Sequence, residues 1–415
     1  MARSEARHTR RWHAGILLFG IGISALGNQI FLVTLNLWVL DRTHSALAVA
    51  GLWMISPLSG LLLGTITGSL ADHRDRRNSL VTANVINAFL IGVIPILSHI
   101  RWIYGILFVT EGLQGLFTAA MASYYRLLVS QDRLAQFNAI RGSLAYGAIT
   151  LGPAVAGLLL AMSRPRTAIW IDSATFLASA LTLLLLPSRN PVFGITKSNS
   201  QGQWRSDLVY VGTFLRRRPM ILSILAGFYG LVVFGSTAAS QEVVFIRNVL
   251  HLSQENYGLL MSLSGVGYVI GSGLFYVFHK RWSVRLVLGT SVSLSAASYL
   301  WFARSHDLLG ATLSLMFLGV FQSIANVGFS TFLQQVIPIE AIGRISGTTM
   351  AVTNGATVLA IFGGGLFTRM AGIRLMMTTA AVSALLSGLW LSAMCLGPGH
   401  QKRWRVIQSM DQAMN

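Results

Sequence analysis

The sequence predicts an all-α integral membrane protein with twelve transmembrane helices arranged as two pseudo-symmetric six-helix bundles. Three observations lead to this fold class: little charge, twelve long apolar stretches, and basic residues concentrated in one set of connections. Only 11% of the 415 residues are charged, and 53% are hydrophobic, whereas soluble domains carry about 25% charged residues. So few charges could not cover a water-exposed surface, and we therefore expect lipid to surround most of the folded chain.

The apolar stretches give the number of membrane crossings. A helix needs about 20 apolar residues to cross a hydrocarbon layer of about 30 Å. The first stretch follows a basic leader but is too long for a signal-peptide core, so we expect it to be a permanent helix. The twelve predicted spans are 14–40, 47–71, 79–99, 102–125, 136–162, 167–187, 219–245, 255–278, 284–303, 308–333, 341–367 and 373–397.

The distribution of basic residues predicts the orientation. Of the 31 Lys and Arg residues, 23 fall on the side of the membrane that holds both termini, and eight fall on the opposite side. Basic connections are retained in the cytoplasm, so we expect a multi-pass protein of the cell membrane with both termini cytoplasmic. The net charge of +18 does not indicate nucleic-acid binding, because the basic residues are dispersed between the spans.

The longest connection, 188–218, divides the chain. It begins polar and ends with an apolar-periodic segment followed by three arginines, a pattern that predicts a cytoplasmic linker with an amphipathic helix. It separates an N-terminal six-helix bundle (1–187) from a C-terminal one (219–397), and a cytoplasmic tail (398–415) follows. The segment Gly273–Trp282 repeats the glycine and the basic cluster of Gly68–Arg77, as two parallel halves would.

The connection after the second span carries a recognisable motif. Its pattern G-x-x-x-D-x-x-x-R-R is formed by Gly68, Asp72, Arg76 and Arg77. In a chain with twelve spans, this pattern resembles the major facilitator superfamily of secondary transporters, and the resemblance extends over the whole chain. His73 stands where that family usually has Arg or Lys, and Asp75 replaces its second glycine.

The resemblance implies that this connection is a cytoplasmic gate. Asp72 would lie at the N-terminus of the helix that starts near Ala341–Gly347, where a negative charge is favoured by about 0.3–1 kcal/mol. Arg76 and Arg77 would pair with Asp132, and the segment would act as a latch that holds the outward-facing state. Under the alternative interpretation, the cluster is only a positive-inside anchor without a mechanism.

The fifth span carries a second motif. Gly152, Pro153 and Gly157 resemble the signature of the drug/proton antiporter branch of the family. Proline removes a backbone hydrogen bond and bends a helix, and glycine lets a neighbouring helix approach closely. Ordinary packing of small residues is the alternative explanation.

One carboxylate falls near the middle of the membrane. Glu111 lies nine residues after Trp102, or roughly 13 Å along a helix. A charge at that depth costs at least about 2.5–3.5 kcal/mol, so such residues usually line a polar cavity. Gln114 follows with the spacing of the family's R-x-x-Q-G motif, in which Glu111 takes the place of the arginine. Glu111 is therefore predicted to carry protons or contact a substrate charge; the alternative is a protonated acid hydrogen-bonded between helices.

Other acids lie at or near the ends of the spans. Asp172 lies about five residues inside the sixth span and is a second candidate for proton coupling, although a structural pair with Arg164 or Arg166 would equally explain it. Asp41 and Glu242 lie near helix ends, and we expect both to be structural.

Uncharged polar and aromatic residues complete the candidate site. The first, fourth, seventh and tenth spans line the central cavity in the family that the chain resembles, and interhelical hydrogen bonding is the alternative role for the polar residues. The candidates for cavity lining are Asn28, Gln29, Asn36, Gln114, Phe228, Tyr229, Gln322 and Asn326.

These features predict a proton-coupled exporter of a hydrophobic or amphipathic small molecule, working as a monomer by alternating access. An uptake symporter and an exporter of siderophores or other metabolites remain open as alternatives. A membrane enzyme or a sensor is disfavoured, because the chain has no cluster of catalytic residue types and no added soluble domain. With a single cysteine, Cys395, an internal disulfide is excluded, and we expect neither a metal nor a cofactor.

Overall fold

The computed structural model describes residues 2–73, 76–129, 133–162, 165–188, 200–278 and 281–397. Within these ranges the chain forms fourteen α-helices and one 3₁₀ helix and no β-strand, which confirms the predicted all-α class. The helices are α1 (Ala2–Thr43), α2 (Ala46–His73), α3 (Arg76–Val93), η1 (Ile94–Ile96), α4 (Ile100–Leu128), α5 (Leu134–Met162), α6 (Pro165–Leu184), α7 (Ser200–Arg216), α8 (Pro219–Ala239), α9 (Glu242–Asn248), α10 (Gln254–Phe278), α11 (Val284–Arg304), α12 (Leu308–Val336), α13 (Ile339–Ala371) and α14 (Ile373–Leu396).

Twelve helical segments among the described residues are long and apolar enough to cross a membrane, which confirms the predicted number. Two of them are composite. The third, Arg76–Ile96, continues from α3 into η1, and the seventh, Pro219–Asn248, includes both α8 and α9. Helix α7 lies between the sixth and seventh spans, in the connection for which the sequence predicts an amphipathic helix.

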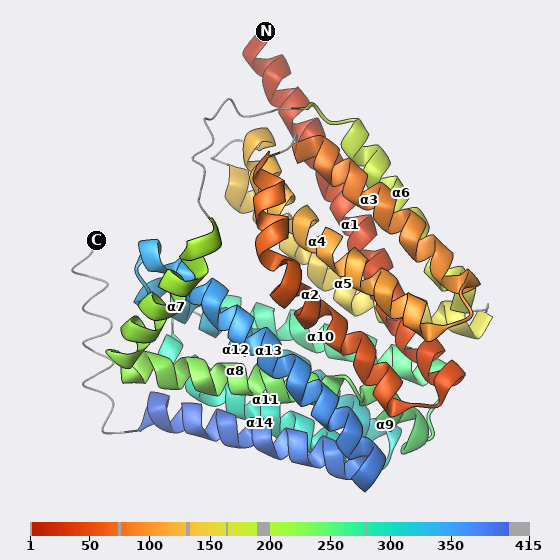
Figure 1. The fold of residues 1–415 in the computed structure, drawn as a ribbon, viewed down its shortest axis with the longest axis vertical. Coiled ribbons are helices and arrows are strands. Elements are labelled where there is room, and N and C mark those ends of the chain that lie inside the picture. The colour runs from red at the N-terminus through yellow and green to blue at the C-terminus, as the bar shows by residue number, and fades with distance from the viewer. Residues whose placement is uncertain are drawn as a thin grey trace. The chain divides into compact units, whose positions relative to one another are not determined.

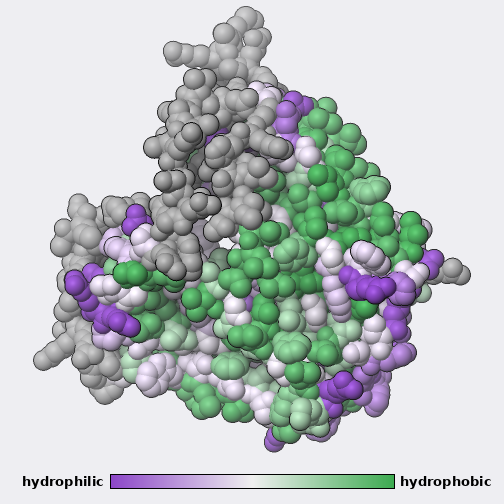
Figure 2. Space-filling model, viewed as in Figure 1, coloured by the Kyte–Doolittle hydropathy of each residue, from purple (hydrophilic) through white to green (hydrophobic). Residues whose placement is uncertain are grey.

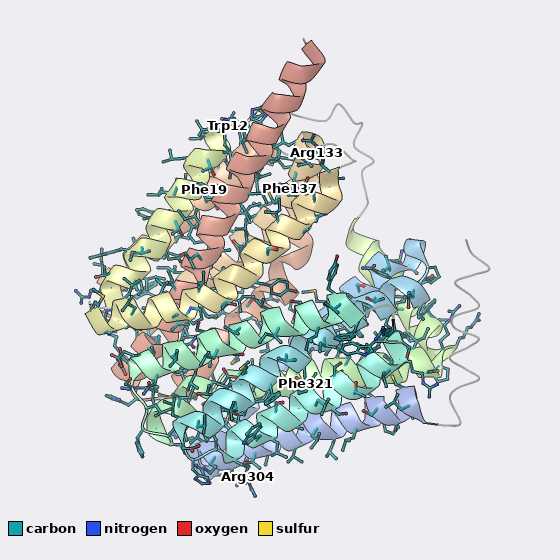
Figure 3. All side chains as sticks on the ribbon, turned by 180° about the vertical axis from the view of Figure 1, so that it is seen from behind. Trp12, Phe19, Arg133, Phe137, Arg304 and Phe321 are labelled. Atoms are coloured by element: carbon teal, nitrogen blue, oxygen red, sulfur yellow. The ribbon has the colours of Figure 1, made fainter. Side chains whose placement is uncertain are left out.

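The surface of these helices is apolar. Met370 is 86% exposed, Tyr276 78% and Phe89 72%, and exposed apolar area on this scale marks a surface that does not face water. Figure 2 shows hydrophobic residues over much of the coloured surface, with the hydrophilic residues gathered in separate patches. Trp12 and Phe19, labelled on α1 in Figure 3, are likewise exposed. This surface fits a lipid environment.

The described residues form two compact units. The first takes its residues from 1–196 together with 253–262, and the second takes them from 197–252 and 263–415. In the first unit, α1 packs along α5 and α6, α2 along α4, and α3 along α6 (Figure 1). In the second, α11 packs along α12 and α14, and α14 packs along α8.

Helix α7 belongs to the core of the second unit. Val211, Phe214 and Leu215 are buried in the same apolar cluster as Ile345 of α13. Arg216 and Arg217, at and just beyond the end of α7, are exposed. The helix therefore buries one apolar face and leaves its basic end open, as an amphipathic helix does.

Polar side chains connect α6 to α3 in the first unit. Ser173 donates its hydroxyl hydrogen to the carbonyl oxygen of Ala88 at 2.6 Å, and Asn84 donates to the hydroxyl of Ser179 at 3.0 Å. Trp170 donates its ring N–H to the carbonyl of Gly92. Because apolar contacts give no hydrophobic driving force between helices in lipid, hydrogen bonds of this kind add about 0.6–2 kcal/mol each to helix association.

The two units repeat one arginine contact. In the first unit, Arg77 is the second residue of α3, and its Nε and Nη2 donate to the carbonyls of Leu183 and Leu184, where α6 ends. In the second unit, Arg285 is the second residue of α11. Its Nε and Nη2 donate to the carbonyls of Cys395 and Leu396, where α14 ends.

The shared geometry has a physical cause. The last carbonyls of a helix have no partner within that helix, and a cation near them is also favoured by the helix dipole. Helices α3 and α6 are the third and sixth spans of the first half, and α11 and α14 are the third and sixth of the second. The arginine therefore occupies equivalent positions in two structural repeats.

Replacing either arginine should lower the stability of its unit. Arg285→Gln removes the positive charge that two terminal carbonyls now contact. We expect the free energy of unfolding to fall by about 1–2 kcal/mol, less than for a fully buried charged hydrogen bond, because the side chain is partly exposed. The melting temperature measured in detergent should fall by about 2–4 °C per kcal/mol. Arg77→Gln should behave alike.

Arg281→Gln is the matched control, because Arg281 lies four residues earlier in the chain and is exposed. Equal melting temperatures for Arg281→Gln and Arg285→Gln would show that the contact contributes nothing to stability.

Candidate functional site

The predicted gate spans the end of α2 and the start of α3. Gly68 and Asp72 lie in the last turns of α2, and Arg76 begins α3. The side chain of Asp72 lies outside the described residues, as does Asp132. The predicted contacts of Asp72 with the start of α13 and of Arg76 and Arg77 with Asp132 therefore stay predictions.

The arginine contacts show that the two halves align three residues away from the alignment that the sequence repeat predicted. Aligning Gly273–Trp282 with Gly68–Arg77 places Trp282 opposite Arg77, whereas Arg285, three residues further on, makes the contact that Arg77 makes. Trp282 stacks on Phe278 with ring centroids 5.2 Å apart. A one-turn difference between the repeats explains why a residue-by-residue alignment missed this equivalence.

The start of α13 is contacted by α7 within the second unit. The Nε of Arg344 lies 3.5 Å from Oδ1 of Asp207, and its guanidinium lies 5.5 Å from the ring centroid of Tyr210. Arg344 is half exposed, so this ion pair contributes at most about 1 kcal/mol. The two residues are far apart in the sequence, so no sequence pattern predicted this ion pair.

The motif in α5 lies in close helix contacts of the first unit. A Cβ atom at Gly152 would collide with the Cβ of Gln29 on α1. A Cβ atom at Gly157 would lie 3.3 Å from the Cα of Gly258, which lies in the part of α10 that belongs to the first unit. Pro153 lies inside α5 without ending it. The motif therefore brings α5 against two neighbouring helices, with Gln29 at one of the contacts.

Glu111 lies in the middle of α4, and its side chain is partly buried. The next residue, Gly112, packs closely on Leu63 of α2, so this face of α4 meets α2. The structure gives Glu111 no hydrogen bond or ion pair with another described residue. Gln114, one turn further along, is also partly buried, and its carbonyl accepts a hydrogen bond from Thr118.

Asp172 is fully buried between α6 and α1. Its Oδ1 accepts a hydrogen bond from Thr175 at 3.3 Å, and its Oδ2 has no hydrogen-bond partner among the described residues. Gly27 of α1 makes room for the carboxyl, because a Cβ atom there would lie 2.6 Å from Oδ1. Arg166, proposed as a structural partner, is exposed and forms no ion pair with Asp172, and Arg164 lies outside the described residues.

The uncharged polar candidates have different environments. Asn36 is buried, donates to the carbonyl of Leu32 and accepts from the ring N–H of Trp53 at 3.0 Å. Gln322 accepts from the hydroxyl of Ser295 at 3.2 Å. Asn36 and Gln322 therefore have interhelical hydrogen bonds, whereas Asn28 and Gln29 are partly buried and Asn326 is exposed.

The aromatic candidates belong to a stacked cluster in the second unit. Phe228 of α8 is buried and lies parallel to Phe329 of α12, with ring centroids 3.6 Å apart. Tyr229 meets the same ring edge to face at 5.5 Å, and its hydroxyl lies 3.2 Å from that of Thr349 on α13. Phe228 thus contributes to the core, and Tyr229 retains a partly exposed polar end.

One carboxylate is more deeply buried than its sequence position suggested. Glu242, expected to be a structural acid near a helix end, does begin α9, but its side chain is 7% exposed and accepts a hydrogen bond from Tyr299 of α11. The feature of the sequence that could have indicated this burial is the run of polar residues within the seventh span.

Among the described residues, no cluster of His, Cys, Asp and Glu side chains could hold a metal ion.

Substitution of Gly152 tests its close contact with Gln29 in the first unit. Gly152→Ala places a methyl group against the Gln29 side chain, and overpacking of this kind costs about 1–3 kcal/mol. Its melting temperature in detergent should therefore fall. Gly147→Ala is the matched control on the same helix, because a Cβ atom there meets nothing within 4 Å and alanine favours a helix by up to about 1 kcal/mol. A Gly152→Ala protein as stable as the control would contradict the close contact.

Comparison with known proteins places the chain among transporters. It is 24% identical over 383 residues to the uncharacterized MFS-type transporter YfiS of Bacillus subtilis, covering 90% of this chain and 91% of that protein. It is also 24% identical over 404 residues to the multidrug efflux pump Tap of Mycobacterium tuberculosis, covering 92% of this chain and 93% of Tap.

Solved structures share the fold. A bacterial homologue of the human lysosomal transporter Spinster, in an inward-facing and unoccupied conformation, superposes with a TM-score of 0.74 at 13% identity over 93% of this chain and 98% of that one. The nucleoside transporter NupG gives a TM-score of 0.71 at 15% identity over 92% of this chain and 98% of that one. The sequence pattern of the Major Facilitator Superfamily matches residues 17–245 and 231–411. The chain belongs to the Major Facilitator Superfamily.

Proposed function

We propose that this protein is a secondary active exporter of hydrophobic or amphipathic small molecules, driven by proton antiport. The observation that carries the proposal is the similarity to the multidrug efflux pump Tap over 92% of the chain. The glycines and proline at the close contacts of α5 support it, because they resemble the signature of the drug/proton antiporter branch. Transport would proceed by alternating access around a site near the middle of the membrane.

Proton coupling would depend on the two carboxylates of the first unit. Asp172 is buried with one oxygen unpartnered among the described residues, and burying an ionised carboxylate without a paired cation costs several kcal/mol. A bound proton removes that cost, so Asp172 would release its proton only when water or a cation reaches it. Glu111 is partly exposed and would be the more accessible carrier or the contact for a substrate cation.

Substrate contacts would come from the polar and aromatic candidate side chains. Tyr229 offers an apolar ring with a hydroxyl at its end, a combination that suits amphipathic molecules. Phe228 would support that ring from the core. The other proposed contacts are Asn28, Gln29, Asn36, Gln114, Gln322 and Asn326.

The gate and the orientation are part of the same proposal. Gly68, Asp72, Arg76 and Arg77 would form the cytoplasmic gate, with both termini in the cytoplasm, as the excess of basic residues on that side favours. The protein would work as a monomer in the cell membrane. Uptake by symport, or export of a siderophore or other metabolite, is the alternative, and the direction of transport separates export from uptake.

Proteoliposomes with an imposed pH gradient provide the test. With ethidium as the probe, the wild-type protein should accumulate dye against its gradient on the acidic side of the membrane. In Asp172→Asn, accumulation should fall to the level seen without a pH gradient, because an amide cannot bind and release a proton, whereas downhill movement of the dye should continue.

Asp41→Asn is the matched control, because Asp41 is exposed and its replacement should leave accumulation unchanged. Accumulation by Asp172→Asn equal to that of the wild type would exclude Asp172 as a coupling residue. Absence of any gradient-driven dye movement in the wild type would argue against a proton-coupled exporter of cationic dyes.

A further inference from the structure

The seventh span is interrupted at a run of polar residues. Helix α8 ends at Ala239 and α9 begins at Glu242, with Ser240 and Gln241 in a turn between them. The N–H of Gln241 bonds to the carbonyl of Ala238, three residues back, rather than four. The hydroxyl of Ser240 donates to the carbonyl of Thr237 at 2.7 Å. Side chains thus supply part of the hydrogen bonding that a continuous helix would make through its backbone.

The polar side chains at this break point into the protein and not toward lipid. Thr237, Ser240, Gln241 and Glu242 are 5%, 1%, 0% and 7% exposed. Gly364 of α13 packs closely on the methyl group of Thr237. In membrane proteins, irregular backbone within a span is found where it is buried in protein or lines a cavity, and discontinuous helices often form binding sites in transporters.

Among the described residues, Glu242 has one hydrogen-bonding partner, and that partner is neutral. The hydroxyl of Tyr299, which is 5% exposed, donates to Oε1 of Glu242. The phenol belongs to α11, so the bond joins the interrupted span to a neighbouring helix of the same unit. Tyr299 also packs edge to face on Phe302, which in turn contacts Phe245 of α9.

Two arginines near α9, Arg247 and Arg374, contact backbone carbonyls and an aromatic ring and not Glu242. Arg247 donates to the carbonyl of Leu252 at 3.0 Å. Arg374 donates to the carbonyl of Ser305, and its guanidinium lies 5.8 Å from the ring centroid of Phe245. No cation among the described residues lies within ion-pairing distance of Glu242. The ionisable side chains at the ends of α9, α11, α12, α13 and α14 on this side of the unit are Arg247, His251, Arg304, His306, Asp307, Arg369 and Arg374.

A charged carboxylate cannot be stable in these surroundings with one neutral hydrogen bond, because burial removes its hydration and nothing replaces the lost charge stabilisation. We propose that Glu242 and Tyr299 form a proton-binding site in the second unit, which holds its proton while the break at Ser240–Gln241 keeps the conformation seen here. This inference rests on the proposed function in one respect: the proton bound at Glu242 would be a further coupling ion of the exporter, besides the one carried in the first unit.

Release requires only a proton acceptor. The O–H bond of the Glu242 carboxyl breaks, the proton passes to a water molecule, and a carboxylate and a hydronium ion result. Movement of α9 relative to α8 at the break would admit that water. The site is separate from Asp172 and Glu111, which belong to the first unit.

Infrared difference spectroscopy of the purified full-length protein tests the site without requiring transport. At neutral pH, the wild-type spectrum should contain the C=O stretching bands of the protonated Asp172 and Glu242 carboxyls. Glu242→Gln should keep the Asp172 band and lose the Glu242 band. In Tyr299→Phe, the Glu242 band should remain but move to higher wavenumber, because the hydrogen bond is gone. Glu255→Gln, which replaces an exposed glutamate, should leave both bands unchanged.

Several results would overturn the proposal. One is a set of carboxyl bands that is the same in the wild type and in folded Glu242→Gln; another is a carboxylate at Glu242 that responds to added sodium and not to pH. If Glu242→Gln does not fold, Tyr299→Phe decides, and the absence of a shifted band would exclude the pair. A wild-type protein that shows the Glu242 band but no gradient-driven dye transport would contradict the proposed function alone.

Discussion

A polar group inside the hydrocarbon layer finds no water, so the chain itself must supply its hydrogen-bonding partner. Most backbone groups meet this requirement within helices, and the remaining ones require particular side chains. Arg77 and Arg285 donate to the last carbonyls of α6 and α14. Asn36 is satisfied by Trp53 and by a backbone carbonyl. These contacts join helices that apolar packing alone would leave free to separate in lipid.

The same constraint makes the exceptions informative. Asp172 and Glu242 are buried carboxyls that the structure supplies with one side-chain hydrogen bond each, from Thr175 and Tyr299. One lies in each unit. Both are too deeply buried to keep a charge without a cation, and no cation among the described residues is close enough to pair with either. A bound proton neutralises such a carboxylate, so buried acids in transporters are candidates for coupling sites.

Glycine determines how closely the helices can approach around these groups. Gly27 leaves space for the Asp172 carboxyl, and Gly152 leaves space for the stem of Gln29. Gly388 of α14 similarly lies against the backbone of Ser293 on α11. A methyl group would collide with the Cβ of Gln29 at Gly152 and would press on the Ser293 backbone at Gly388, and neither neighbour has much freedom to move. Close approach and polar contacts therefore occur together in the same interfaces.

Composition and apolar length were sufficient to predict the helical class and the twelve spans, because both follow from the thickness and polarity of the membrane. The chemistry of individual side chains was harder to predict. The sequence placed Glu242 correctly near a helix end, but hydropathy does not reveal whether a side chain at that place turns toward lipid or into the unit. The equivalence of Arg77 and Arg285 was missed because it depends on which carbonyls lie opposite each arginine, and the repeats differ there by three residues.

The proposed gate requires that the strongly basic connections lie on the cytoplasmic side of the membrane and the weakly basic connections on the outer side. Labelling of single cysteines in intact cells tests this directly, in a chain whose own cysteine is removed by Cys395→Ala. A membrane-impermeant thiol reagent should label His306→Cys from outside. It should reach Arg217→Cys only after the membrane is permeabilised. Both positions are exposed in the structure, so accessibility within the protein does not limit the reaction. Labelling of Arg217→Cys in intact cells would contradict the orientation and the proposed gate with it.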